Sequence, residues 1–130
     1  MTGFTDTLAI SASGMKAQAA RLRHVTENVA NADTPGYRRK MVSFREEMGI
    51  GAPDGAVRTG PVRLDQGELE RIYDPANRLA DESGYYDGSN VDLVVEIADA
   101  REAQRSYEAN LKLFDQARQM SAGLLDLLRR

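Results

Sequence analysis

Two long segments, one at each end of the sequence, have helical patterns that are too apolar on one side for either helix to be stable alone. In the first segment, residues 5–32, an unbroken heptad seam recurs at alternating steps of four and three: Leu8, Ala12, Met15, Ala19, Leu22, Thr26 and Val29. In the second segment, residues 91–128, many polar residues collect into one narrow stripe, and apolar residues occupy much of the remaining circumference. The sequence therefore predicts a long helix at each end of the chain.

The breadth of the apolar surface on the second helix predicts assembly. A helix that is apolar over so much of its circumference has to be covered on more than one side, and one partner helix from the same chain cannot do that. Other copies of the chain are the simplest source of the missing cover. We therefore expect these residues to pack between subunits: Leu8, Met15, Leu22, Val29, Ile97, Tyr107, Leu111, Phe114 and Leu125.

The segment between the two helices has short strand patterns. The first helix is expected to stop within residues 31–36, because Pro35 cannot continue a helix and Gly36 permits a positive φ. Strands are expected at 37–44, 56–64 and 68–73, with Pro61 favouring an edge position for the second of them. The loop at 49–60 carries a turn signal at 53–55, and the mostly polar residues 74–90 are expected to be irregular.

The expected fold is mainly α with a small β-rich insert. Its long terminal helices pair as a coiled coil that polymerisation completes. Residues 1–36 form the N-terminal core helix and turn, 37–90 form a small outer module, and 91–130 form the C-terminal core helix. At 130 residues, the three segments amount to one discontinuous domain.

The composition excludes several classes of function. The chain has no cysteine, so disulfides, thiolate metal sites and cysteine nucleophiles are excluded. The net charge of −3 gives no electrostatic reason to expect nucleic acid or an anionic membrane as a partner. Residues 1–15 contain no Lys or Arg and do not resemble a cleavable signal peptide, and no stretch approaches the roughly eighteen apolar residues of a membrane span. Taken alone, these features are typical of a cytoplasmic protein, and an exported chain would need a route that ignores classical signals.

No catalytic, metal-binding or cofactor-binding residue is predicted. His24 lies opposite the heptad seam, where a solvated or intersubunit polar position is expected and partners for a metal ion are lacking. The adjacent acidic pairs at 46–47 and 81–82 point to opposite faces of extended backbone, so neither pair converges on one glycosidic bond. The one basic cluster is interpreted as a solvated strand face or a contact to an acidic neighbour, not as a nucleic-acid site: Arg38, Arg39, Lys40 and Arg45.

Several blocks of the sequence resemble the bacterial flagellar rod and hook proteins. Residues 28–37, NVANADTPGY, look like the N-terminal signature of this family, and the residues that carry the match are Asn28, Asn31, Pro35, Gly36 and Tyr37. Four further blocks narrow the resemblance to the proximal rod proteins over nearly the whole chain: YDP at 73–75, LADESGY at 79–85, NVD at 90–92 and SYEAN at 106–110, which ends in Asn110. The chain departs from the pattern at Arg78, where relatives often have proline, and in the 49–60 loop.

The resemblance implies a structural subunit of the flagellar basal-body rod without enzymatic activity or cofactor. Such proteins are exported unfolded through the flagellar type III apparatus without signal cleavage. They polymerise into a helical tube across the periplasm and transmit torque for motility. The resemblance also implies that the β insert faces outward. The implied partners are copies of the chain, other rod subunits (FlgB-like and distal rod proteins) and the export apparatus.

Two questions stay open at this point. A cytoplasmic helical adaptor or export chaperone would explain the missing signal peptide and the apolar helices equally well. It would not explain why the 28–37 signature and the 106–110 block occur together. The second question concerns Asn28 and Asn31, whose amides can close the last turn of the first helix, hydrogen-bond a neighbouring subunit, or do both.

Overall fold

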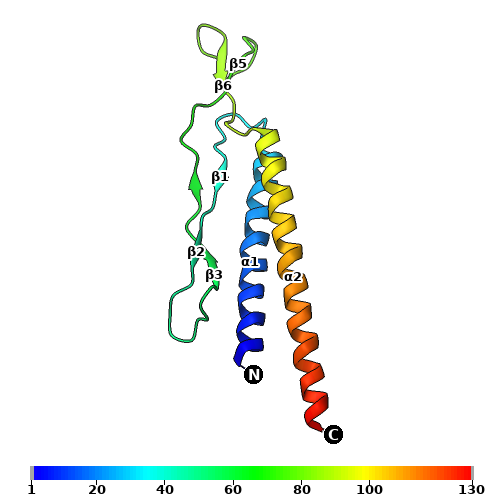
Figure 1. Cartoon of the computed structure of the whole chain (residues 1–130). Coiled ribbons are helices and arrows are strands. Elements are labelled where there is room, and N and C mark those ends of the chain that lie inside the picture. Colours follow the sequence, from blue (N-terminus) through cyan, green and yellow to red (C-terminus); the bar gives the residue numbers. More distant parts are fainter. Residues whose placement is uncertain (1, 130) are drawn as a thin grey trace.

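Two antiparallel helices form a long shaft in this computed structural model, which describes residues 2–129 (Figure 1). Helix α1 spans Thr2–Ala30 and helix α2 spans Leu93–Arg129. At about 1.5 Å per residue they are about 44 Å and 56 Å long. The expected pair of long terminal helices with a small β-rich insert is confirmed. Helix α1 begins three residues earlier than expected and ends two residues earlier.

Small and polar residues hold the two helices together. The buried residues of α1 are Ser11, Ala17, Val25 and Asn28, of which Ala17 and Val25 also line spaces toward the hairpin, and those of α2 are Glu96, Ala103 and Ala117. Gly14 of α1 faces Asn110 of α2 so closely that a Cβ atom at Gly14 would lie 2.7 Å from the Asn110 amide nitrogen. Because these side chains are short, the helix axes can approach closely. The large apolar side chains of both helices are therefore left on other faces.

A long, irregular hairpin lies alongside α1 (Figure 1). Strands β1 (Lys40–Met41) and β2 (Phe44–Glu46) pair antiparallel with β4 (Arg63–Leu64) and β3 (Val57–Thr59), respectively. Pro61 lies in the gap between β3 and β4 and has no backbone N–H to extend the ladder. The strand expected at 37–44 is replaced by β1 and the start of β2. The strand expected at 56–64 is divided into β3 and β4. The backbone N–H of Val57 donates to Ser13 Oγ at 3.1 Å, which attaches the hairpin to α1.

A second, shorter hairpin lies beyond one end of the helix pair (Figure 1). Strand β5 (Arg71–Tyr73) pairs with β6 (Tyr85–Asp87). The expectation that residues 74–90 are irregular is wrong for β6, and the strand expected at 68–73 begins only at Arg71. Strand β6 escaped prediction because its residues lack apolar alternation. The Asp81 carboxylate organises the turn before it by accepting hydrogen bonds from the backbone N–H groups of Ser83 and Tyr85 at 3.0 and 3.1 Å.

The predicted helix stop is also the point where the chain returns to the helices. Gly36 has a φ of +76°, and its N–H donates to the carbonyls of Asp87 and Gly88 at 3.2 and 3.0 Å. The Ser89 hydroxyl donates to the carbonyl of Ala32. The end of α1 is thus tied directly to the segment that leads into α2. This junction fixes the end of α1 next to the start of α2.

Candidate assembly surface

A buried polar cluster joins the hairpin to both helices, with Asn28 at its centre. Asn28 Nδ2 donates to the Lys40 carbonyl at 3.0 Å and to Glu96 Oε2 at 3.2 Å. Asn28 Oδ1 accepts from the Lys40 N–H and from the Tyr37 hydroxyl, both at 2.8 Å. Two donated and two accepted bonds use the full capacity of a primary amide. We call Asn28, Tyr37, Lys40, Glu96 and Arg39 the polar cluster.

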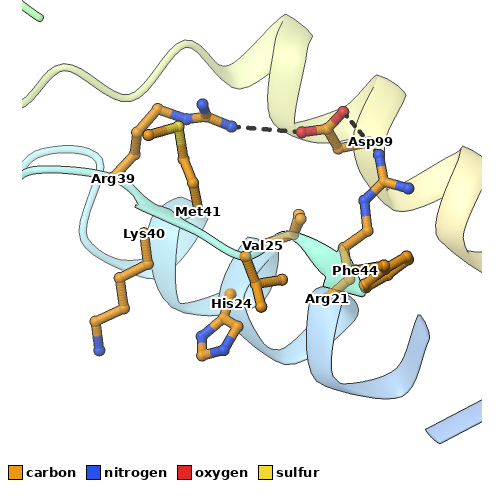
Figure 2. A pocket seen from close by; sticks show the side chains of 9 residues that line it. Arg21, His24, Val25, Arg39, Lys40, Met41, Phe44 and Asp99 are labelled. Atoms are coloured by element: carbon orange, nitrogen blue, oxygen red, sulfur yellow. Dashed lines mark hydrogen bonds and ion pairs between the residues drawn. The ribbon is translucent and has the colours of Figure 1, made fainter. Parts of the chain in front are cut away.

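Charged side chains complete the polar cluster on the α2 side. Glu96 is fully buried, and its Oε1 accepts from Arg39 Nε at 2.6 Å. Asp99 lies between two guanidinium groups, 3.4 Å from Arg39 Nη2 and 3.2 Å from Arg21 Nη2 (Figure 2). A buried carboxylate is tolerated only when it is paired and hydrogen-bonded. Glu96 meets that condition through Arg39 and Asn28, so it locks hairpin, α1 and α2 in one arrangement.

The protonation states of the cluster suit this locking role. Burial raises the pKa of the Tyr37 hydroxyl, so it remains a hydrogen-bond donor. Partial burial opposes the charge of Arg39, but the hydrogen bond and charge of Glu96 outweigh it, and the pKa of Arg39 is raised. Lys40 Nζ lies 2.6 Å from Glu27 Oε2, and this bond lowers the pKa of Glu27 and raises that of Lys40.

A cavity of about 310 Å³ lies beside the cluster, between α1, the start of α2 and the hairpin (Figure 2). Its walls are apolar at Val25 and Phe44, and Asp99 with its two arginines lies along its rim. His24, for which a solvated or intersubunit polar position is expected, is half-buried and lines this cavity. The described residues include no cluster of three His, Cys, Asp or Glu side chains that could hold a metal ion.

Helix α1 has three faces with three different surroundings. Gly14, Arg21 and Asn28 face α2, at intervals of seven residues. Ser13 and the alanines near it face the hairpin, where they line a groove beneath β3. The third face carries the predicted heptad seam, which is partly accessible along its length and touches the groove beneath β3 only at Ala19. Its exposed and half-buried members are Leu8, Ala12, Met15, Ala19, Leu22, Thr26 and Val29.

Helix α2 carries a matching open stripe. Glu96 and Asn110 mark the side that faces α1. Leu93, Ile97 and Leu111 lie about one quarter of a turn away and are exposed. A helical projection places this stripe and the α1 seam on the same side of the helix pair, opposite the long hairpin. We call the combined surface the two-helix face.

The predicted packing residues fall into two groups. Val29, Ile97, Leu111 and Leu125 are exposed; Val29 keeps 44% of its surface accessible and Ile97 51%. Leu8, Met15, Leu22, Tyr107 and Phe114 are half-buried. Large exposed apolar patches are typical of interaction sites, and the four exposed residues are candidates for such a patch.

The signature residues have roles within the chain. Asn28 neither closes the helix end nor is available to a neighbouring subunit, because its amide is fully used in the polar cluster, so both interpretations are wrong for it. Asn31 does serve the helix end: its Nδ2 donates to the Glu27 carbonyl at 2.9 Å, and its Oδ1 accepts from Thr34. Asn110 Nδ2 donates to the Ser106 carbonyl and leaves its side chain against Gly14.

The structure also brings together residues that the sequence interpretation missed. The basic cluster is mostly neutralised inside the chain, since Arg39 and Lys40 form ion pairs and Arg38 donates to the carbonyls of Asp65 and Gly67. The interpretation of this cluster as a solvated strand face is wrong for these three residues, whereas the alternative of a contact to an acidic neighbour holds for Arg39 and Lys40 within the chain. Glu96 was missed too, although an acidic residue between Leu93 and Ile97 on an apolar helix face is a signal of a buried pair.

Comparisons with known proteins agree with the resemblance. Two family models match: "Flagella basal body rod protein" over residues 8–38 and "Flagellar basal body rod FlgEFG protein C-terminal" over residues 82–127. Flagellar basal-body rod protein FlgC from Agrobacterium fabrum is 42% identical over 92% of this chain and 91% of its own length. The proteins of that name from Salmonella typhimurium and Bacillus subtilis are 35% and 31% identical, over 91% and 98% of this chain and 92% and 99% of their own. Neither described helix is long and apolar enough to cross a membrane.

Proposed function

This chain belongs to the family of flagellar basal-body rod proteins FlgC and is a structural rod subunit, and from that premise we propose that it polymerises through its two-helix face. Family membership favours a rod subunit over the cytoplasmic adaptor. The observation that carries the proposal is that the exposed α2 stripe and the α1 seam, exposed at Val29 and half-buried at its other large residues, lie on one side of the same helix pair.

The physical argument is the cost of leaving this face in water. Removing apolar surface from water contributes a stabilising free energy of roughly 25 cal/mol per Å². Each side chain on the two-helix face that is buried on assembly adds to this free energy. Within the chain, α1 and α2 already contact each other through small and polar residues, so the large apolar residues remain for a neighbour. A stiff shaft without covalent links is the expected product of many such contacts. Torque transmission follows from that stiffness.

The remaining features of the family role are proposals for this chain. The two hairpins, on the other side and at the end of the helix pair, form the outer module within residues 37–90. The proposed partners are copies of the chain, FlgB-like and distal rod subunits, and the type III export apparatus. The proposed location is the periplasmic part of the basal body, reached without signal cleavage. No enzymatic role is proposed.

Single charges placed on the two-helix face test the proposal. Leu22→Asp and Leu111→Asp would each bury an unpaired carboxylate in the polymer, which costs several kcal/mol. We expect both variants to be absent from isolated basal bodies and to be non-motile. Arg63→Asp, on the exposed surface of the long hairpin and outside the two-helix face, is the matched control and should be motile. Normal incorporation of both leucine variants would contradict packing through this face.

A further inference from the structure

The short hairpin at the end of the molecule is built as a rigid acidic head. We call residues 68–90 the head; it contains six acidic residues and two arginines. Arg71 spans the hairpin, 2.8 Å from Asp81 and 3.2 Å from Asp87, and its guanidinium carbon lies 5.7 Å from the centre of the Tyr85 ring. Gly84 has a φ of +88°, and the Tyr73 ring packs against it so closely that a Cβ would lie 2.8 Å away.

This rigid head exposes apolar side chains that nothing in the described chain covers. Tyr73 keeps 64% of its surface accessible and Leu79 62%, although Tyr73 also contacts the Tyr85 ring at 5.1 Å. Fixing a loop in one conformation costs conformational entropy. A loop that is fixed while its large apolar residues face outward is already organised to bind a partner.

A complementary surface lies on the far half of α2. Leu113, Met120 and Leu127 recur at intervals of seven, so they share one side of the helix, and Met120 is 58% exposed. They are rotated away from the two-helix face, toward the side of the long hairpin. We call them the outer stripe. An exposed edge of α2 lies beside the end of the outer stripe nearest Leu113. It carries one acidic residue, Glu108, and three basic residues that form no ion pair within the described chain: Arg101, Arg105 and Lys112.

We propose that the head of one copy docks on the outer stripe of the next copy, with Tyr73 and Leu79 against Met120 and its neighbours. The head carries Glu68, Glu70, Asp74 and Glu82 free of ion pairs within residues 2–129, and the edge of the stripe is basic, so the charges are complementary. Head and stripe lie toward opposite ends of the molecule (Figure 1).

The geometry of such a contact gives it a distinct role. Because two different surfaces of the same chain meet, the contact is heterologous and repeats as an open chain instead of closing as a dimer. A tube needs contacts in two directions. This inference rests on the proposed function: the two-helix face supplies one direction, and the contact between head and stripe supplies the other.

Charge reversal tests the complementarity. The variant with Arg105→Glu and Lys112→Glu, and the variant with Asp74→Lys and Glu82→Lys, should each lower the amount of chain in isolated basal bodies about tenfold. Combining all four substitutions should restore it. The matched control, Arg45→Glu with Arg63→Glu, changes two exposed arginines outside both surfaces and should have no effect. Reversals that behave like this control, or a combination without rescue, would overturn the proposal.

Cysteine cross-linking locates the contact directly, because the chain has no cysteine of its own. A chain with Leu79→Cys and Met120→Cys, oxidised in basal bodies isolated from cells that express no other copy, should give a ladder at multiples of the subunit mass. A chain with Arg63→Cys and Met120→Cys should give no ladder. A subunit that is present in basal bodies but forms no ladder contradicts the head-to-stripe contact alone. Absence of the unsubstituted chain from basal bodies contradicts the proposed function as well.

Discussion

The polar cluster and the two-helix face distribute polar and apolar residues in the opposite way to an ordinary globular protein. In the cluster, Glu96 and Asn28 are fully buried and completely hydrogen-bonded. On the face, Val29, Ile97 and Leu111 remain exposed to water. The difference indicates that specific polar contacts fix the fold of the single chain, whereas the exposed apolar surface is available for the proposed assembly. The following changes separate these two contributions, from the largest expected effect on the chain's own stability to the smallest.

Removing Glu96 should have the largest effect. Glu96→Ala leaves the Arg39 guanidinium and the Asn28 amide partly buried without their partner, and breaking such a pair costs about 3–5 kcal/mol. Urea unfolding of the purified chain measures the loss. Glu102→Ala is the control, because Glu102 is mostly exposed and its contact to Arg21 is long, so a change below about 1 kcal/mol is expected. Equal effects of the two substitutions would contradict the central role of the cluster.

Filling the gap at Gly14 should have an intermediate effect. Gly14→Ala improves helix propensity by about 1 kcal/mol, but the new methyl group meets the Asn110 side chain, and overpacking costs about 1–3 kcal/mol. We therefore expect a net destabilisation in thermal unfolding. Adding Asn110→Ala removes the clash and should recover the lost stability. If Gly14→Ala alone stabilises the chain, the helices do not approach as closely as described.

Asp81 should give the head a small stability term that depends on pH. Hydrogen bonds from Ser83 and Tyr85 and the ion pair with Arg71 hold the pKa of this carboxyl well below its ordinary value. Because the folded-state pKa is depressed, the contribution is complete above the unfolded-state pKa of about 3.9 and is lost as pH falls toward the folded-state pKa. Carbon-13 NMR titration should find the Asp81 carboxyl still ionised at pH 3.5. An ordinary midpoint near 3.9 would contradict this description of the turn.

Substitution on the two-helix face should have almost no effect on the isolated chain. Ile97→Ser removes an exposed side chain, so the free energy of unfolding should change by less than about 0.5 kcal/mol. The same change should reduce incorporation into basal bodies. Glu96→Ala should instead lower the free energy of unfolding strongly, so the two substitutions together separate the polar cluster from the two-helix face. A large loss of stability in Ile97→Ser would show that the face is part of the chain's own core.

Hydrophobic periodicity was enough to predict the helix pair and its open seam, but not the contact between the helices. The α1 seam from Leu8 to Val29 was visible because large apolar residues recur along it. The side that actually meets α2 carries Gly14, Arg21 and Asn28, which no hydrophobic pattern identifies. Strand β6 was missed because it is held by backbone pairing and the Asp81 turn. The partners of Asn28 come from three separate segments, so only the folded chain brings them together.

The central claim, that the two-helix face is open in the single chain and covered in the rod, is tested most directly by the reactivity of Ile97→Cys toward a water-soluble maleimide. The rate is measured for the purified subunit and for isolated basal bodies, with Arg63→Cys as the exposed reference. Our account predicts rapid labelling of the subunit and at least about tenfold slower labelling in basal bodies, while the reference is labelled rapidly in both. Equal rates at Ile97→Cys in the subunit and in basal bodies would contradict it.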